Sequence, residues 1–318
     1  MRITSLSRIQ RKSHAPRNIV FIAFMLAFIL ALTITIISVH AAWKLIHPDR
    51  LDIPGFSANI VPKYSNVSFK DIQDELILRG WYFDVIGSSK TLIIAHDYAS
   101  NRLPYGEETI HIIKEFLDEG YNVLTFDFRN SGESDGGTTT MGLCEKNDVL
   151  GAVRFTKNKG ATEIVVMGLS MGASCAIWAA AECDSIDAVI ADSPFSSLDD
   201  FIGGGTNLPK TPFSKTVPLA VKVITGLDFS VADPWEVVGK LSPRPLLLIH
   251  SRDDTKTPIQ NSRLIYESAD TKNTILWEMS GVDHGECYLK DPDKYIQKII
   301  EFLNPAKEIP NNPETNED

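Results

Sequence analysis

The feature that most constrains the fold of this chain is an uninterrupted apolar run near its start. Twenty-one residues, Ile19 to Val39, contain no charged residue and no proline. At a helical rise of about 1.5 Å per residue the run measures about 31 Å, the thickness of the hydrocarbon core of a bilayer. Helices of soluble proteins rarely stay apolar on every face over such a length. The run therefore predicts a transmembrane helix over residues 19–42.

The charges before this run predict its orientation. Five basic residues and no acidic ones precede it: Arg2, Arg8, Arg11, Lys12 and Arg17. By the positive-inside rule, residues 1–18 are expected in the cytoplasm and the chain after the transmembrane helix outside it. Val39-His40-Ala41 is similar to a signal cleavage site, but the run exceeds the roughly 7–15 apolar residues of a secretory signal. We therefore expect a retained, single-pass signal anchor, with a secreted body as the alternative.

The part of the chain beyond this helix is acidic. The whole sequence has 31 Lys and Arg against 41 Asp and Glu, a net charge of −10. Without the five N-terminal basic residues, 26 basic residues face 41 acidic ones, a net charge of −15. Sequence-independent binding of nucleic acid requires a basic face, so a nucleic-acid partner is not expected.

The four cysteines give no indication of a metal or redox site, because none of them forms a C-x-x-C motif. Cys175 and Cys183 lie eight residues apart on one predicted helix, about 12 Å, which is too far for a disulfide. We expect free thiols, with a Cys144–Cys287 disulfide as the alternative.

After a connector, residues 43–65, short apolar runs alternate with helical patterns. Runs of this kind are typical of strands buried on both faces of a sheet. They lie at 76–85, 91–95, 122–126, 164–167, 188–191 and 246–249, and a further strand-like segment lies at 274–279. The helical patterns lie at about 105–118, 145–158, 171–183, 259–268 and 291–303. The alternation predicts an α/β domain over 66–303, with a mostly parallel sheet flanked by helices.

Two segments depart from this alternation. Residues 193–240 contain Gly203-Gly204-Gly205 and several prolines, which indicates a lid or cap inserted into the domain. Residues 304–318 are rich in proline and acidic residues, which is typical of a disordered tail.

The pentapeptide Gly168-Leu169-Ser170-Met171-Gly172 joins a predicted strand to a predicted helix. It matches G-x-S-x-G, a short motif that carries little information by itself. The strand before it and the helix after it make the arrangement of a nucleophile elbow, in which small residues permit a sharp and strained turn. Ser170 is therefore the candidate nucleophile, and the backbone N–H of Met171 is the first candidate oxyanion donor.

A serine nucleophile needs a base, and the base needs an orienting acid. Among seven histidines, His284 is the best candidate base because it lies in a loop after the strand-like segment 274–279. Asp253 and Asp254 follow the buried run at 246–249, and the spacing does not choose between them. Either acid gives the chain order Ser…Asp…His of α/β-hydrolases. Asp283 is a poorer candidate because it is the direct neighbour of the base.

The second oxyanion donor is expected from the loop that follows the run at 91–95. This loop reads His96-Asp97-Tyr98-Ala99-Ser100-Asn101-Arg102. The N–H of Tyr98 is the candidate. His96 and His250 each end an apolar run, and we expect them to pack near the site.

From about residue 66 to 303, the chain resembles the α/β-hydrolase superfamily. It looks closest to bacterial, often membrane-anchored members akin to serine aminopeptidases and prolyl-oligopeptidase-like hydrolases. Five ordered motifs carry the resemblance: His96–Arg102, Asp127–Ser134, Gly168–Gly172, His250–Pro258 and Asp283–Gly285. It implies an α/β-hydrolase fold, with Asp254 as the catalytic acid and structural roles for Asp127 and Arg129. Asp97 replaces the glycine that this family usually has in the oxyanion loop.

These features predict a membrane-anchored serine hydrolase that acts on carboxylic esters or short acyl amides without a metal or organic cofactor. Its expected partners are a small ester, acyl or short peptide substrate and the membrane. A peptidase with the same triad is one alternative. A catalytically silent binding protein on the same fold, supported by Asp97, is another.

Overall fold

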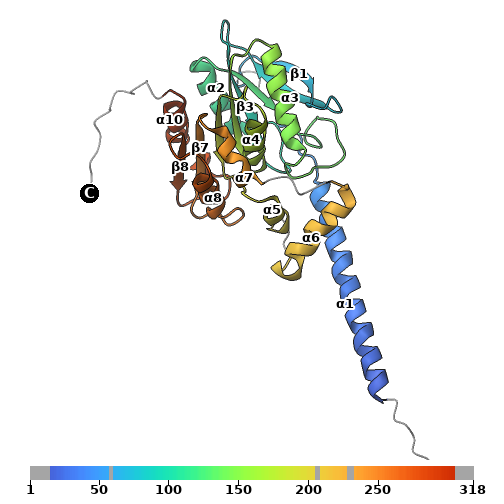
Figure 1. Cartoon of the computed structure of the whole chain (residues 1–318). Coiled ribbons are helices and arrows are strands. Elements are labelled where there is room, and N and C mark those ends of the chain that lie inside the picture. The colour runs from blue at the N-terminus through green and yellow to red at the C-terminus, as the bar shows by residue number, and fades with distance from the viewer. Residues whose placement is uncertain (1–14, 57–59, 205–207, 228–232, 305–318) are drawn as a thin grey trace, which may run out of the picture.

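A computed structural model describes residues 15–56, 60–204, 208–227 and 233–304. Residues 1–14 of the predicted basic segment and 305–318 of the predicted tail lie outside the described residues. The chain forms one long N-terminal helix, α1 (Ala15–Ile46), which projects from an α/β domain (Figure 1).

An eight-stranded sheet forms the centre of the domain, with the strand order β1-β2-β4-β3-β5-β6-β7-β8. The strands are β1 (Ser65–Lys70), β2 (Ile77–Phe83), β3 (Lys90–Ala95), β4 (Asn122–Phe126), β5 (Glu163–Leu169), β6 (Ala188–Asp192), β7 (Leu246–Ser251) and β8 (Thr274–Met279). Only the pairs β1·β2 and β2·β4 are antiparallel. The predicted mostly parallel sheet is confirmed.

The apolar runs of the sequence predict every strand except β1. This strand lies at the edge of the sheet, and of its six residues only Phe69 is fully buried. By contrast, every side chain of β4, β6 and β7 is buried. A continuous apolar run therefore marks the central strands, whereas a half-exposed edge strand has a weaker pattern.

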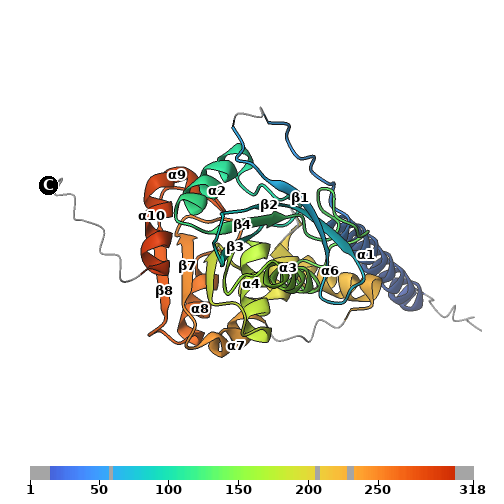
Figure 2. The same cartoon turned by 90° about the horizontal axis from the view of Figure 1, so that it is seen from above.

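Helices cover both faces of the sheet (Figure 2). One face packs against α3 (Glu145–Asn158), α4 (Met171–Glu182) and α8 (Gln260–Ser268). The other packs against α2 (Thr109–Asp118), α9 (Cys287–Lys290) and α10 (Pro292–Leu303), with η1 (Gly106–Glu108) leading into α2. Alternate residues of one strand serve the two layers, since Ile93 faces the first and Leu92 the second.

The predicted insert between β6 and β7 has two structurally different parts. Its second part, α7 (Pro234–Val237) and η2 (Val238–Leu241), packs against α4 and α8 within the domain. Its first part, α5 (Leu198–Gly204) and α6 (Lys210–Thr225), lies at the edge of the domain, and α6 packs against α1 (Figure 1). We call α5 and α6 together the lid.

Helix α1 changes character along its length. Every residue from 17 to 33 is exposed, whereas Ile34, Ser38, Ala42 and Leu45 form a buried or half-buried face on its later turns. The spacing of three to four residues places these side chains on one side of the helix, the side that meets α6. From Arg17 to Ile46, the helix is long and apolar enough to cross a membrane.

Candidate active site

The turn between β5 and α4 holds Ser170 in a strained conformation, with φ of 53° and ψ of −113°. Both glycines of the pentapeptide are required by crowding around this turn. A Cβ on Gly168 would lie 2.2 Å from the carbonyl oxygen of Gly172, and a Cβ on Gly172 would lie 2.2 Å from that of Ala95. The G-x-S-x-G pattern is therefore what allows β5, α4 and the end of β3 to meet behind the serine.

The fold brings Ser170, His284 and Asp254 together from three separate loops. His284 Nε2 lies 2.9 Å from Ser170 Oγ, and His284 Nδ1 lies 2.6 Å from Asp254 Oδ2. Ser170 is 1% exposed, so little water reaches its hydroxyl group. In this geometry the imidazole can accept the serine proton while its other nitrogen donates to the carboxylate.

The other two acids considered from the sequence link the loops that carry Asp254 and His284. Asp253 Oδ2 accepts a hydrogen bond from the N–H of Gly281 at 2.6 Å. Asp283 Oδ1 accepts one from the N–H of Thr255 at 2.9 Å. Each carboxylate thus reaches from its own loop to the backbone of the opposite one, which fixes the distance between the acid and the base.

Asp254 is buried among hydrogen-bond donors. Its Oδ1 accepts the backbone N–H groups of Lys256 and Thr257 at 2.9 and 2.7 Å. Burial alone would raise the pKa of this carboxyl group, but the hydrogen bonds from His250, His284 and the Thr257 amide outweigh it and lower the pKa below its ordinary value. Asp254 is therefore a carboxylate at neutral pH, as the partner of an imidazolium must be.

His250 lies directly behind this carboxylate and is completely buried. Its Nε2 lies 2.7 Å from the carbonyl oxygen of Thr257 and 3.2 Å from Asp254 Oδ2. Both of these atoms accept hydrogen bonds, so the proton is on Nε2, and Nδ1 accepts from Ser262 Oγ at 2.7 Å. The sequence places His250 at the end of a buried strand, near the site, but does not predict its contact with the acid.

The loop that carries Tyr98 is fixed by a second buried histidine. His96 Nε2 accepts the N–H of Phe128 at 3.0 Å, so its proton is on Nδ1, which donates to the carbonyl oxygen of Asp97 at 2.6 Å. Burial lowers the pKa of His96, which keeps the ring neutral despite the acidic groups around it. A Cβ on Gly172 would also lie 2.5 Å from the His96 carbonyl oxygen, so this loop lies directly against the elbow that carries Met171.

The side chain of Tyr98 reaches away from the loop to α1. Its hydroxyl group donates to the carbonyl oxygen of Leu45 at 2.8 Å. Burial, with a smaller contribution from the charge of Glu145, raises the pKa of Tyr98 to about 12, so the phenol stays protonated and keeps this bond. In the neighbouring residue, Asp97, Oδ1 is buried and has no hydrogen-bond partner within the described ranges.

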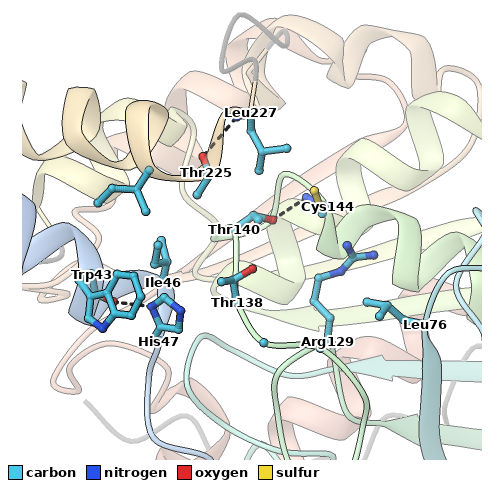
Figure 3. A pocket seen from close by; sticks show the side chains of 13 residues that line it. Trp43, Ile46, His47, Leu76, Arg129, Thr138, Thr140, Cys144, Thr225 and Leu227 are labelled. Atoms are coloured by element: carbon cyan, nitrogen blue, oxygen red, sulfur yellow. Dashed lines mark hydrogen bonds between the residues drawn. The ribbon is translucent and has the colours of Figure 1, made fainter.

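A cavity of about 520 Å³ lies apart from the triad, between the last turns of α1 and α6 and the loop 136–144 (Figure 3). Trp43 and His47 stack in its wall with ring centroids 4.0 Å apart. Arg129 also lines it, but its Nη2 pairs with Asp148 Oδ1 at 2.6 Å and its backbone N–H with Asp148 Oδ2 at 2.9 Å. The paired guanidinium stabilises the loop after β4, which is a structural role.

Asp127, for which the family resemblance also implies a structural role, fixes the turn that follows β4. Its Oδ1 accepts the N–H of Arg102 at 2.7 Å, and its Oδ2 accepts the N–H of Glu133 at 2.9 Å. A Cβ on Gly132 would lie 2.4 Å from this carboxyl group.

In the described part of the chain, no three His, Cys, Asp or Glu side chains gather in a way that could hold a metal ion.

Known proteins share this fold and much of this sequence. The family model for the alpha/beta hydrolase fold matches residues 90–219. Protein YqkD of Bacillus subtilis is 31% identical over 235 residues, which are 71% of this chain and 75% of that protein. The lysophosphatidylserine lipase ABHD12 of Mus musculus is 27% identical over 204 residues, 59% of this chain, and the match spans about half, 48%, of that lipase.

Solved structures point the same way. The esterase Pf2001 of Pyrococcus furiosus superimposes with a TM-score of 0.68 at 30% sequence identity. The match covers 82% of this chain and 99% of that esterase. The chain therefore belongs to the α/β-hydrolase family.

Proposed function

We propose that this protein is a membrane-anchored serine hydrolase that cleaves carboxylic esters. The observation that carries the proposal is the continuous hydrogen-bonded chain from Ser170 through His284 to Asp254 on a strained elbow. The similarity to proteins named as an esterase and a lipase supports an ester bond as the target.

The proposed reaction follows from the positions of these groups. Ser170 Oγ attacks the ester carbonyl carbon while His284 Nε2 takes its proton, and Asp254 stabilises the imidazolium that forms. The backbone N–H groups of Met171 and Tyr98 donate to the oxyanion, helped by the N-terminus of α4. The ester C–O bond then breaks, the protonated histidine gives its proton to the leaving alcohol, and water releases the acyl group by the same steps.

The proposed location is the cell membrane, with the N-terminus in the cytoplasm and the catalytic domain outside. The exposed apolar surface of α1 supports a retained anchor, because such a surface is stable in lipid and not in water. The last residues of α1 also hold the domain directly: the carbonyl oxygen of Ile46 accepts the N–H of Thr139 at 2.9 Å, beside the bond from Tyr98 to Leu45. The anchor is thus joined to the domain by contacts rather than by a free linker.

The test is hydrolysis by the full chain in detergent of esters of graded acyl length, with aminoacyl amides alongside. Ser170→Ala should lower ester hydrolysis by about 10⁴-fold or more and abolish labelling by a fluorophosphonate probe. Ser174→Ala is the matched control, because this serine lies one turn further along α4 and bonds to Phe195 instead of His284. If the Ser170→Ala protein were labelled as strongly as the parent chain, the proposal would be wrong. Faster cleavage of the amides than of the esters would identify a peptidase.

A further inference from the structure

A hydrogen bond joins the lid to α1 near the C-terminal end of the apolar run. Ser38, which is 2% exposed, donates from its Oγ to Thr216 Oγ1 of α6 at 2.7 Å. Ser38 follows the first apolar residue, Ile19, by nineteen residues, or about 29 Å of helix, which is close to the full thickness of a hydrocarbon core. If α1 spans the membrane as proposed above, Thr216 lies at the outer boundary of the hydrocarbon.

The other end of α6 meets α1 slightly farther out. Ile224 and Leu227 line the cavity of Figure 3 together with Trp43. The indole of Trp43 is 54% exposed, and tryptophan side chains concentrate at the level of the lipid headgroups. The contact between α6 and α1 therefore extends from the hydrocarbon boundary to the headgroup region of the outer leaflet.

The exposed surface of α6 combines apolar and basic side chains. Lys215, Leu219 and Val223 follow one another at intervals of four residues, so they form one stripe along the helix. Leu219 is 60% exposed and Val223 is 76% exposed. Such a stripe is unfavourable in water but suits the boundary between acyl chains and headgroups.

The charge of this segment is opposite to that of the rest of the domain. The 27 residues 201–227 contain three lysines, Lys210, Lys215 and Lys222, and no acidic residue, whereas the first turn of α5 just before them contains Asp199 and Asp200. The chain as a whole has ten more acidic than basic residues. A basic segment on an acidic protein faces the anionic surface of a bilayer favourably, whereas the acidic remainder is repelled by it.

The lid also contacts the proposed oxyanion loop. Phe201 of α5 stacks on Phe195 with centroids 4.4 Å apart, and its ring meets that of Tyr98 edge-on at 6.4 Å. Tyr98 in turn bonds to Leu45 of α1. The loops at the carboxyl ends of the parallel strands therefore carry the proposed triad and also meet the lid and α1.

From these contacts we propose that α6 lies in the outer leaflet beside α1, and that the site takes lipid esters directly from that leaflet. The proposal rests on the proposed function, because it needs both the anchor and the triad. The partner that α6 fits is the surface of a bilayer with anionic lipids. The substrate class is an ester whose acyl chain is dissolved in the membrane.

Contact with lipid is tested independently of activity by tryptophan fluorescence in vesicles of phosphatidylcholine and phosphatidylglycerol. Brominated phosphatidylcholine should quench the fluorescence that Leu219→Trp adds to that of the five native tryptophans. Ile86→Trp is the matched control, because Ile86 is 98% exposed in the turn that leads into the N-terminal end of β3, whereas Ser170 follows the C-terminal end of the neighbouring parallel strand β5. Unquenched added fluorescence at position 219 would overturn the proposal.

The proposed transfer of lipid esters from the bilayer to the site is tested with the double variant Leu219→Glu/Val223→Glu. The control is Ile86→Glu. The double variant should hydrolyse a long-chain monoacylglycerol dissolved in vesicles at least about tenfold more slowly, since two apolar side chains no longer enter the bilayer. Its hydrolysis of soluble p-nitrophenyl butyrate should match that of the parent chain, which also shows that it folds. Equal rates of the double variant and the parent on the vesicle substrate would refute the lid contact while leaving the triad intact.

The lysines are tested by Lys210→Gln/Lys215→Gln on vesicles with and without phosphatidylglycerol. The parent chain should be faster on the anionic vesicles, and each lost lysine should reduce that advantage about fivefold. If the double variant kept the full rate increase on anionic vesicles, these lysines would not attract α6 to the anionic lipid surface. If neither the parent nor any variant cleaves p-nitrophenyl butyrate, the proposed function fails instead, and the quenching experiment still decides whether α6 touches lipid.

Discussion

Among single residues, two buried histidines hold the loops that surround the proposed triad. His96 and His250 are both fully buried, and each holds one loop of the site through its two ring nitrogens. His250 also contacts the carboxylate of Asp254, which makes it a positioning residue for the triad. Without His250, Oδ2 of Asp254 keeps only His284 as a partner among the residues that the structure describes, while Oδ1 keeps the N–H groups of Lys256 and Thr257.

We predict that His250→Phe lowers kcat for ester hydrolysis by about 10–100-fold with little change in KM, because the acid shifts relative to His284 while His250 itself is completely buried and cannot contact a substrate. His250→Gln retains an N–H donor and should recover part of the loss. Steady-state kinetics, with thermal unfolding measured alongside, check this expectation. A parallel rise in KM, or no recovery in the glutamine variant, would indicate a purely structural role.

At the scale of elements, the elbow shows that one glycine can decide how a helix and two strands meet. Gly172 lies in the first turn of α4, where its missing Cβ leaves room for the carbonyl oxygens of Ala95 and His96 at the end of β3. The order of the sheet requires this approach, because β3 and β5 are direct neighbours and the helix after β5 must pass close to the loop after β3.

Gly172→Ala should therefore destabilise the fold by about 3 kcal/mol or more, since the added methyl group meets backbone rather than a flexible side chain. Gly137→Ala is the control: a Cβ there has no neighbour within 4 Å, and its effect should stay within about 0.5 kcal/mol. Urea unfolding of the two proteins in the same detergent measures both values. Similar midpoints for the two variants would contradict the crowding argument.

At the scale of the whole molecule, charge and apolar surface are divided among separate parts. Residues 1–17 are basic, residues 19–32 are apolar on all sides, the α/β domain is acidic, and α6 is basic again. In the proposed topology, each part would lie in the environment that suits it: cytoplasm, hydrocarbon, exterior and outer lipid surface.

The topology predicts that alkaline phosphatase fused after residue 318 is active in a bacterial host, because this enzyme folds only outside the cytoplasm. Replacing the five basic residues before Ile19 by glutamine should reduce the active fraction, since the positive charges retain the N-terminus inside. Phosphatase activity per unit of fusion protein is the measurement. A silent phosphatase fusion, together with a fluorescent green fluorescent protein fusion at the same position, would reverse the proposed orientation.

Local patterns in the sequence predict the features that depend on near neighbours. The apolar run of α1, the buried strands and the helices between them follow from periodicity, and the resemblance in five motifs led to the same fold. The strand–turn–helix context of Ser170 belongs to this group as well, because the elbow is a local structure. The edge strand β1 was not predicted. It packs against the domain on one side only, so its six residues show little alternation of apolar and polar side chains.

The contacts between distant residues follow from the way the whole chain folds. The fold places Asp254, the acid that the family resemblance implies, against His284. It also uses Asp253 and Asp283 to link the two loops, and puts His250 behind the acid. It also joins Ser38 to Thr216 across 178 residues of chain, which sets the lid against the membrane helix. Such contacts follow from how the sheet orders its strands and closes their loops together, and no local pattern of residues carries that information.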